Sequence, residues 1–349
     1  MDAIGSVRRF GRTVAWVGLA LAALSPLSPA QAADAADFFK GKTVRIVVGY
    51  SPGGGYDALA RLLTHPLEKR LGATVIVENK PGAGGLGALN SLIRDNPDGL
   101  RTMLLNGEGA ALAQIVDLPG MRFDLATLGI LARVSYENRI LLAGAKTPFH
   151  SIDGFAKATS PVVFGSGGRI DGMGDMAQIF CRAMKIPCKL VIGYPGSNDV
   201  TMALRRGEVN AQVTSESQTA MMVRSDNDIV AVAVLSPNRA PMLPKTPTIF
   251  ELTKLSPEQS KWIRFRAGIS DIGRVLVLPP KVPAERAQVL EAAFRSVLTD
   301  PAVIAEGERT NRPLNFASAG DTRAVIKRII SDLTPDERKE IKELILHGY

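Results

Sequence analysis

The strongest constraint in this sequence is a local pattern that occurs twice between Val44 and Gly87. The apolar run Arg45–Tyr50 is followed by the loop Ser51-Pro52-Gly53-Gly54-Gly55 and then by leucines at helical spacing. The run Thr74–Glu78 is likewise followed by Pro81-Gly82-Ala83-Gly84-Gly85 and by a second helical stretch. Apolar β-branched runs bounded by Pro and Gly are typical of buried strands. We therefore expect two successive units of strand, glycine loop and helix.

These two glycine loops are also the strongest functional signal in the chain. Each loop follows a presumed parallel strand, and open α/β sheets bind their ligands at the carboxyl ends of the strands. Backbone N–H groups and the dipole at a helix N-terminus attract anions. We therefore expect the loops to bind an anion through the backbone, without any basic side chain.

The same rhythm begins again after residue 148. Further apolar runs end in the candidate loops Gly165–Arg169, Gly193–Asn198 and Thr214–Ser217. The apolar run Arg274–Leu278 is expected to return to the first domain. The prediction is an α/β protein in which residues 33–143 and 274–349 form domain 1 and residues 144–273 form domain 2.

The first 32 residues have the composition of a leader. Arg8, Arg9 and Arg12 precede an apolar stretch over residues 13–24, and Ala30-Gln31-Ala32 matches a small-x-small cleavage site. This arrangement is typical of a secretory signal peptide, and the stretch is too short for a membrane anchor. We expect export to the periplasm and cleavage after Ala32.

Composition argues against several kinds of partner. The formal net charge is +8, but the basic residues are scattered and only 5% of residues are aromatic, so no nucleic-acid partner is expected. Cys181 and Cys188 are the two cysteines. In an oxidising compartment a disulfide between them is favoured over two buried thiols. No histidine lies near them in the sequence, so they do not indicate a metal site.

Catalytic motifs are weak or missing. Gly82–Gly87 matches the dinucleotide-binding pattern G-x-G-x-x-G, and Glu108 lies where a ribose-binding acid would be expected. The match does not open the domain, however, and a four-residue segment separates it from its strand. The three histidines, His65, His150 and His347, are not placed as general bases, and no G-x-S-x-G, Walker A or H-E-x-x-H pattern occurs. We expect a non-enzymatic binding protein without cofactor or metal, with a dinucleotide enzyme as the alternative.

Longer stretches around these loops support one family. The stretches VVGYSPGGGYDALAR, VIVENKPGAGG and LRRGEVNA, with RAP and PKTPT between residues 239 and 248, resemble the Bug family. This family comprises the solute receptors of tripartite tricarboxylate transporters. The similarity extends over nearly the whole chain after the leader. It implies a type II periplasmic-binding-protein fold, in which two doubly wound α/β domains close over a small carboxylate.

The resemblance also implies a set of ligand-binding residues. In domain 1 they are Ser51, Gly53, Gly54, Gly55, Tyr56, Asp57, Gly82, Ala83, Gly84 and Gly85, and in domain 2 they are Ser166, Gly167, Tyr194, Ser197, Thr214 and Ser215.

Four further residues lie near the expected cleft, some of them where this chain departs from the family pattern. Arg169 is expected either to grip a second carboxylate or to be a solvated surface residue. Tyr56 is expected either to stack on an aromatic acid or to pack at the loop edge. Glu108 and Glu216 are candidates to receive an amine or a hydroxyl group, which leaves the ligand open.

The resemblance implies an exported, monomeric receptor that captures a small organic acid and presents it to a membrane permease. A receptor of the same fold that senses its ligand for a signalling partner is the alternative.

Overall fold

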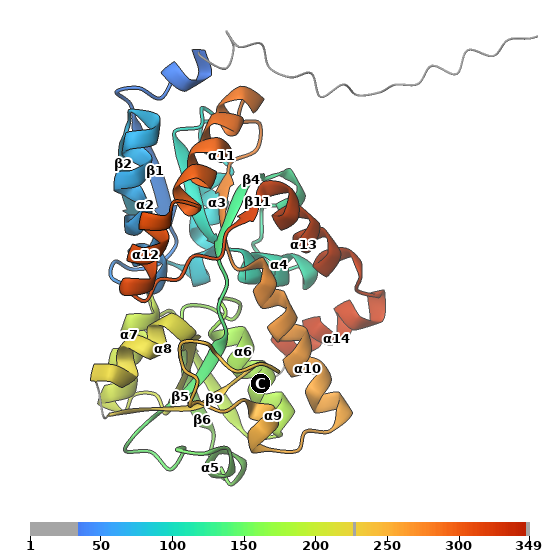
Figure 1. The fold of residues 1–349 in the computed structure, drawn as a ribbon. Helices are drawn as coiled ribbons and strands as arrows, with labels where there is room; N and C mark the ends of the chain where they lie inside the picture. Colours follow the sequence, from blue (N-terminus) through green and yellow to red (C-terminus); the bar gives the residue numbers. More distant parts are fainter. Residues whose placement is uncertain (1–33, 226–227, 347–349) are drawn as a thin grey trace, which may run out of the picture.

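The computed structural model describes residues 34–225 and 228–346, so the leader predicted over residues 1–32 lies outside the described residues. The described chain forms two β-sheets flanked by helices, one in each half of the molecule (Figure 1). This architecture confirms the expected α/β fold class. Among the described residues, no helix has the length and hydropathy needed to cross a membrane.

The first sheet has the strand order β11-β4-β10-β3-β1-β2. Its strands are β1 (Thr43–Val48), β2 (Thr74–Asn79), β3 (Arg101–Asn106), β4 (Gly129–Ser135), β10 (Arg274–Leu278) and β11 (Ala317–Ser318). β1 pairs in parallel with both β2 and β3, as expected for the two glycine-loop units. The returning strand β10 lies antiparallel between β3 and β4.

The second sheet has the order β7-β6-β8-β5-β9. Its strands are β5 (Arg139–Gly144), β6 (Val162–Ser166), β7 (Cys188–Ile192), β8 (Ala211–Ser215) and β9 (Ile229–Val234). β5 pairs with β8 and β9, so the chain crosses between the sheets at residues 136–138. The boundary predicted at residue 143 puts β5 in domain 1, whereas the strand belongs to the second sheet. The sequence of an apolar strand does not indicate which of two sheets it joins. The remaining domain boundaries stay a prediction.

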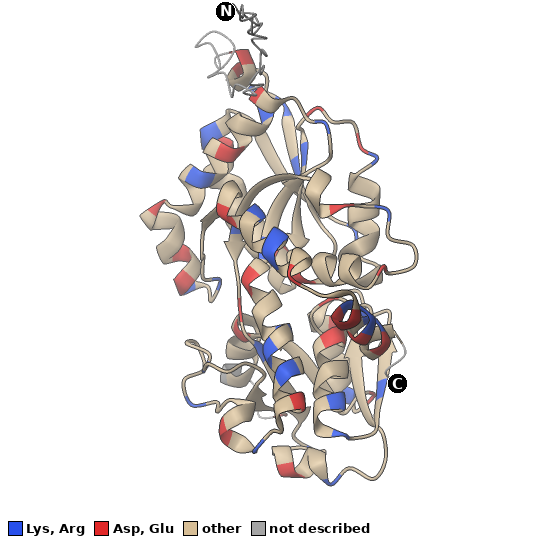
Figure 2. Ribbon diagram, turned by 90° about the vertical axis from the view of Figure 1, so that its right-hand side faces the viewer, with Lys and Arg blue, Asp and Glu red and all other residues tan. Residues whose placement is uncertain are grey.

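Helices cover both sheets. They are α2 (Gly55–Leu71), α3 (Leu86–Leu92), α4 (Gly107–Ile115), α5 (Ile152–Ala156), α6 (Gly174–Met184), α7 (Ser197–Arg206), α8 (Glu216–Ser225), α9 (Ile249–Leu252), α10 (Pro257–Ile269), α11 (Ala284–Leu298), α12 (Pro301–Arg309), α13 (Ala319–Ser331) and α14 (Pro335–Leu346). Acidic and basic residues are interspersed along the outer helices rather than segregated (Figure 2).

One hydrophobic cluster extends across both halves. It includes Leu112 of α4, Phe180 of α6, Ile263 of α10 and Ile345 of α14, all of them buried. The long helix α10 packs on α6, and α14 packs on both α6 and α4. The C-terminal helix therefore contacts both halves, although from the sequence we assigned it to domain 1 alone.

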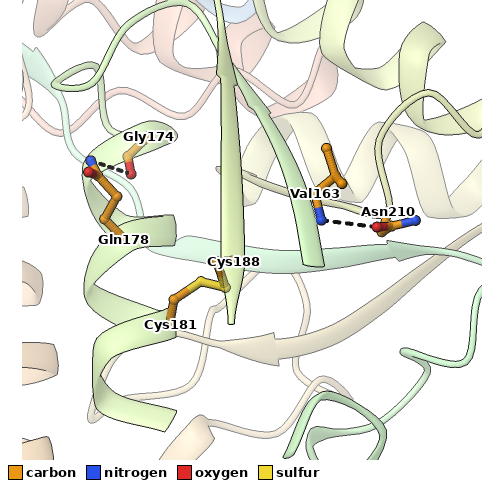
Figure 3. Close-up of a disulfide and its surroundings, with 6 residues drawn as sticks. All are labelled: Val163, Gly174, Gln178, Cys181, Cys188 and Asn210. Atoms are coloured by element: carbon orange, nitrogen blue, oxygen red, sulfur yellow. Dashed lines mark hydrogen bonds between the residues drawn. A yellow bond between two sulfur atoms is a disulfide. The ribbon is translucent and has the colours of Figure 1, made fainter. Parts of the chain in front are cut away.

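Cys181 of α6 and Cys188 of β7 form a disulfide (Figure 3). The bond fastens the end of the helix to the edge strand of the second sheet, because β7 pairs only with β6 among the described strands. The structure thus contains the disulfide that we favoured from the sequence.

We expect the double variant Cys181→Ala/Cys188→Ala to be less stable to unfolding by about 2 kcal/mol, because the unfolded chain gains loop entropy. Its affinity for ligand should be unchanged, because neither cysteine lines the cavity described below. Urea denaturation under oxidising conditions measures the difference, with the reduced wild-type protein as a second reference. Equal midpoints for the variant and the oxidised wild type would contradict the prediction.

Candidate functional site

A small cavity lies where the loops of the two sheets meet. It is lined by Tyr50, Gly54, Gly55, Tyr56, Arg139, Asp171, Met173, Ser197, Thr214, Ser215 and Arg274. Its volume is about 40 Å³, which is room for only a few water molecules. The two halves are therefore closed on each other, and a ligand larger than that requires them to separate.

Direct hydrogen bonds join the first glycine loop to the second half. The N–H of Ser51 donates to the carbonyl of Pro195 at 3.0 Å, and the Ser51 hydroxyl donates to Asp199 at 2.9 Å. Asn198 donates from Nδ2 to the carbonyl of Gly53 at 2.9 Å. These bonds hold the loop before α2 against Pro195 and the first turn of α7.

The second glycine loop packs on the other half without lining the cavity. Gly84 has a φ of 63°, and a Cβ there would lie 2.6 Å from the Cβ of Asp171. The Tyr50 hydroxyl donates to the Gly84 carbonyl at 2.8 Å. Gly84 thus allows close approach between the halves. Gly82, Ala83, Gly84 and Gly85 were all expected to line the site, and none of them is among the residues that line this cavity.

Two helices begin at the cavity without a capping side chain. Gly54 precedes α2 and Gly196 precedes α7, and neither position carries a side chain that could accept from the helix N–H groups. Gly54, Gly55 and Ser197 line the cavity. The positive ends of two helix dipoles therefore face the same space.

Arg139 and Arg274 line the cavity as well, so the expectation of a site without basic side chains was wrong. Arg139 donates from Nε and Nη2 to Glu108, the shorter bond measuring 2.8 Å. Glu108 also accepts from Arg266 at 2.8 Å, and Arg266 in turn donates to Asp175 at 2.8 Å. All four side chains are buried. Glu108 is therefore engaged by two arginines and is not among the residues that line the cavity. Its candidate role as receiver of a ligand amine or hydroxyl group stays a prediction.

The electrostatics of this network follow from its geometry. Burial alone would raise the pKa of Glu108, but the charges of Arg139 and Arg266 hold it below the ordinary value. Burial alone would lower the pKa of Arg139, and Glu108 more than reverses this, so the pKa is raised. Both groups therefore stay ionised at neutral pH.

A second buried ion pair also borders the cavity through Arg274. Arg274 donates to Glu137 and, at 3.0 Å, to the hydroxyl of Ser135. The Arg274 guanidinium lies 5.0 Å from the centre of the Tyr56 ring, which stacks on Tyr50 at 4.7 Å. Burial raises the pKa of Tyr56 to about 12, so its phenol remains neutral.

Asp171 occupies a nest of donors at the start of α6. One carboxylate oxygen accepts from the N–H groups of Met173 and Gly174 and from the Ser166 hydroxyl, at 2.9, 2.8 and 2.7 Å. The other accepts from the N–H of Gly167 at 2.8 Å. Ser166 and Gly167 therefore face Asp171, although the resemblance implied that they face the ligand.

The remaining predicted residues divide between the cavity and other roles. Tyr56, Thr214 and Ser215 line the cavity. Asp57 accepts from Gly53 and Arg61, and Glu216 accepts from Asn138 and from the N–H of Met242. Tyr194 is half-buried, its ring near Gly165, and Arg169 is exposed.

Sequence reasoning missed Tyr50, Arg139, Asp171, Met173 and Arg274 as lining residues. Two of them carried a usable signal. Arg139 and Arg274 each open an otherwise apolar run, and a charged side chain that enters a buried strand requires a partner. Among the described residues, no group of three or more His, Cys, Asp or Glu side chains is placed to hold a metal ion.

We expect Glu108→Gln to lower the stability by about 3–5 kcal/mol at neutral pH, because it leaves buried Arg139 without a carboxylate partner and Arg266 with Asp175 alone. Since the pKa of Glu108 is lowered in the folded state, its contribution is present above the unfolded value of about 4.3 and is lost as the pH falls through the folded value. The variant should therefore lose less stability on acidification than the wild type. Urea titrations from pH 7 to pH 3 measure both effects. Glu208→Gln, in an exposed pair with Arg206, is the control and should change little.

We expect Gly84→Ala to destabilise the closed structure, because the new Cβ meets the Cβ of Asp171 in addition to the unfavourable positive φ. Gly41→Ala is a matched control, because Gly41 has a φ of 70° and nothing within 4 Å of its Cβ position. Thermal melts compare the two variants. An equal loss of melting temperature in both would mean that the contact with Asp171 contributes nothing.

Comparisons with known proteins agree with this architecture. The family model described as "Tripartite tricarboxylate transporter family receptor" matches residues 59–312. A UPF0065 protein of Bordetella pertussis is 26% identical over 300 residues, which cover 84% of this chain and 85% of that protein. The solved periplasmic binding protein BugD has a TM-score of 0.74 and 22% identity, with 87% of this chain and 97% of that chain covered. R. palustris Rpa4515, solved with adipate, has a TM-score of 0.72 and 18% identity, with the same coverage.

The two structural likenesses confirm the two-domain fold of periplasmic binding proteins. The family match begins at residue 59 and covers most of α2, all of α3, the strands β2 to β10 and the cavity residues from Arg139 to Arg274. The chain therefore belongs to the tripartite tricarboxylate transporter family of receptors, the Bug family that its glycine loops resemble.

Proposed function

We propose that the protein binds a small organic acid in the cavity between its two sheets and delivers it to the membrane subunits of a tripartite transporter. The observation that carries this proposal is the convergence of two uncapped helix N-termini and two arginines on one buried cavity. Such a place favours a carboxylate through backbone N–H groups and helix dipoles. The adipate in Rpa4515 supports the same ligand class.

Binding would proceed by hinge closure. The halves are joined by the crossing at residues 136–138 and by the chain that leads from α10 into β10. A ligand that contacts both halves favours the closed state by its differential affinity for that state. The bonds of Ser51 and Gly53 to Pro195 and to the first turn of α7 would open and re-form in each cycle.

We further propose that the protein acts in the periplasm as a monomer, after cleavage of the leader, and that it catalyses no reaction. The family match supports a receptor role. The permease would recognise the closed, ligand-bound form.

A thermal-shift screen of the mature protein tests the proposal, because a ligand that binds only the folded state raises the melting temperature. The screen includes monocarboxylic, dicarboxylic and tricarboxylic acids, amino acids and NAD. We expect stabilisation by at least one organic acid. Stabilisation by NAD alone, or by no acid, would overturn the proposal.

Gly54→Val tests the site itself. We expect at least a tenfold loss of affinity for the acid found in the screen, because the side chain would point at the Ser51 carbonyl and Ser197 hydroxyl, where the anion must approach. Gly54 has a φ of −75°, so valine fits the backbone and the fold should be retained. Gly268→Val, exposed on α10 with open space around its Cβ position, is the control. Calorimetric titration that gives the same affinity for both variants would place the ligand elsewhere.

A further inference from the structure

Four helices begin around the cavity, and two of them already bind carboxylates of the chain. The N–H groups of Met173 and Gly174, at the start of α6, donate to Asp171. The N–H of Ser217, at the start of α8, donates to Glu137 at 2.7 Å. The N-termini of α6 and α8 thus already bind carboxylates of the chain, and these N–H groups do not remain for an anion of the ligand.

The other two helices leave one place for an anion. α2 and α7 begin at Gly54 and Gly196 without capping side chains, and both starts border the cavity. The Nη2 atom of Arg274 lies 3.7 Å from the position that a Cβ on Gly55 would take. One carboxylate can therefore meet the N–H groups of α2, those of α7 and the free edge of Arg274 together.

Both arginines that line the cavity are already compensated by carboxylates of the chain. Arg139 is paired with Glu108, and Arg274 is paired with Glu137. Among the described residues, the buried charged side chains are the arginines 139, 266, 274 and 312 and the carboxylates Asp57, Glu108, Glu137, Asp171, Asp175 and Glu216. Among these buried side chains, carboxylates outnumber arginines by six to four. One of the carboxylates, Asp171, lines the cavity itself.

A second ionised carboxylate in this space would be desolvated beside Asp171. Neither lining arginine would offset the cost, because Glu108 and Glu137 already engage them. The other side chains around the cavity are neutral. They are the stacked rings of Tyr50 and Tyr56, the thioether of Met173 and the hydroxyls of Ser197, Thr214 and Ser215. These groups suit an apolar or neutral polar body.

We propose that the cavity selects acids with a single carboxylate and excludes those with a second ionised carboxylate, Asp171 and Glu137 being the side chains that enforce the choice. This inference rests on the proposed function, and it names the ligand class of the same site.

Matched pairs of acids that differ by one carboxylate test the inference. Suitable pairs are hexanoate with adipate, butyrate with succinate, benzoate with terephthalate, and glutamine with glutamate. Calorimetric titration of the wild-type protein at pH 7.5 should show, for the pair that binds, at least tenfold tighter binding of the member with one carboxylate.

The outcomes separate the two proposals. Equal or tighter binding of the member with two carboxylates would overturn the inference and leave the receptor function standing. Binding of no acid in any pair would overturn the receptor function and the inference with it.

A charge-neutral variant tests the named residues. Glu137→Gln removes the anion that compensates Arg274, so the preference for one carboxylate should fall at least tenfold, mainly through tighter binding of the dicarboxylate. A purely structural role of Glu137 would weaken both members of a pair equally and leave their ratio unchanged. Glu208→Gln, in the exposed pair with Arg206, is the control and should not move the ratio. If Glu137→Gln does not fold, the wild-type comparison alone decides.

Discussion

The ion pairs of Glu108 are the interaction on which the closed structure depends. Glu108 lies at the start of α4 and binds Arg139 on β5 and Arg266 on α10, so one carboxylate ties the first half to both the crossing strand and the long helix. Burial of a carboxylate destabilises a protein unless the carboxylate is paired with a cation. Here the two cations that donate to Glu108 lie on regular elements, Arg139 on β5 and Arg266 on α10. The network therefore fixes the orientation of Arg139 at the cavity while it joins the halves.

The cavity combines helix N-termini that attract an anion with carboxylates of the chain that limit how much negative charge a ligand can bring. Helix N-termini attract any anion, so a cleft with four of them would bind highly charged ligands without discrimination. In this chain Asp171 and Glu137 fill two of the four, and the arginines face carboxylates of the chain as well as the cavity. The electrostatic field that remains is that of a site for one negative charge.

Much of the fold could be predicted from the sequence, because local residue patterns determine where its strands, loops and helices lie. The β-branched runs, glycine loops and leucine spacing of residues 44–87 report burial and element type directly, and they match β1, α2 and β2. The disulfide could be favoured because Cys181 and Cys188 are close in sequence and the leader predicts export to an oxidising compartment. The roles of Glu108 and of the loop Gly82–Gly85 could not be predicted. They depend on residues 139, 171 and 266, which only the tertiary fold brings near.

The position of β10 has a consequence for how the chain acquires its structure. This strand lies in the interior of the first sheet, between β3 and β4, yet it follows the entire second half in sequence. Before β10 joins the sheet, β1, β2 and β3 are separated from β4. The edges of β3 and β4 that pair with β10 then have no hydrogen-bond partner. Pairing across so long a separation carries a large loop-closure entropy, which a folded second half reduces by bringing Ser135 and Arg274 together. From this topology we expect the half that begins the chain to complete its sheet only after the second half has formed.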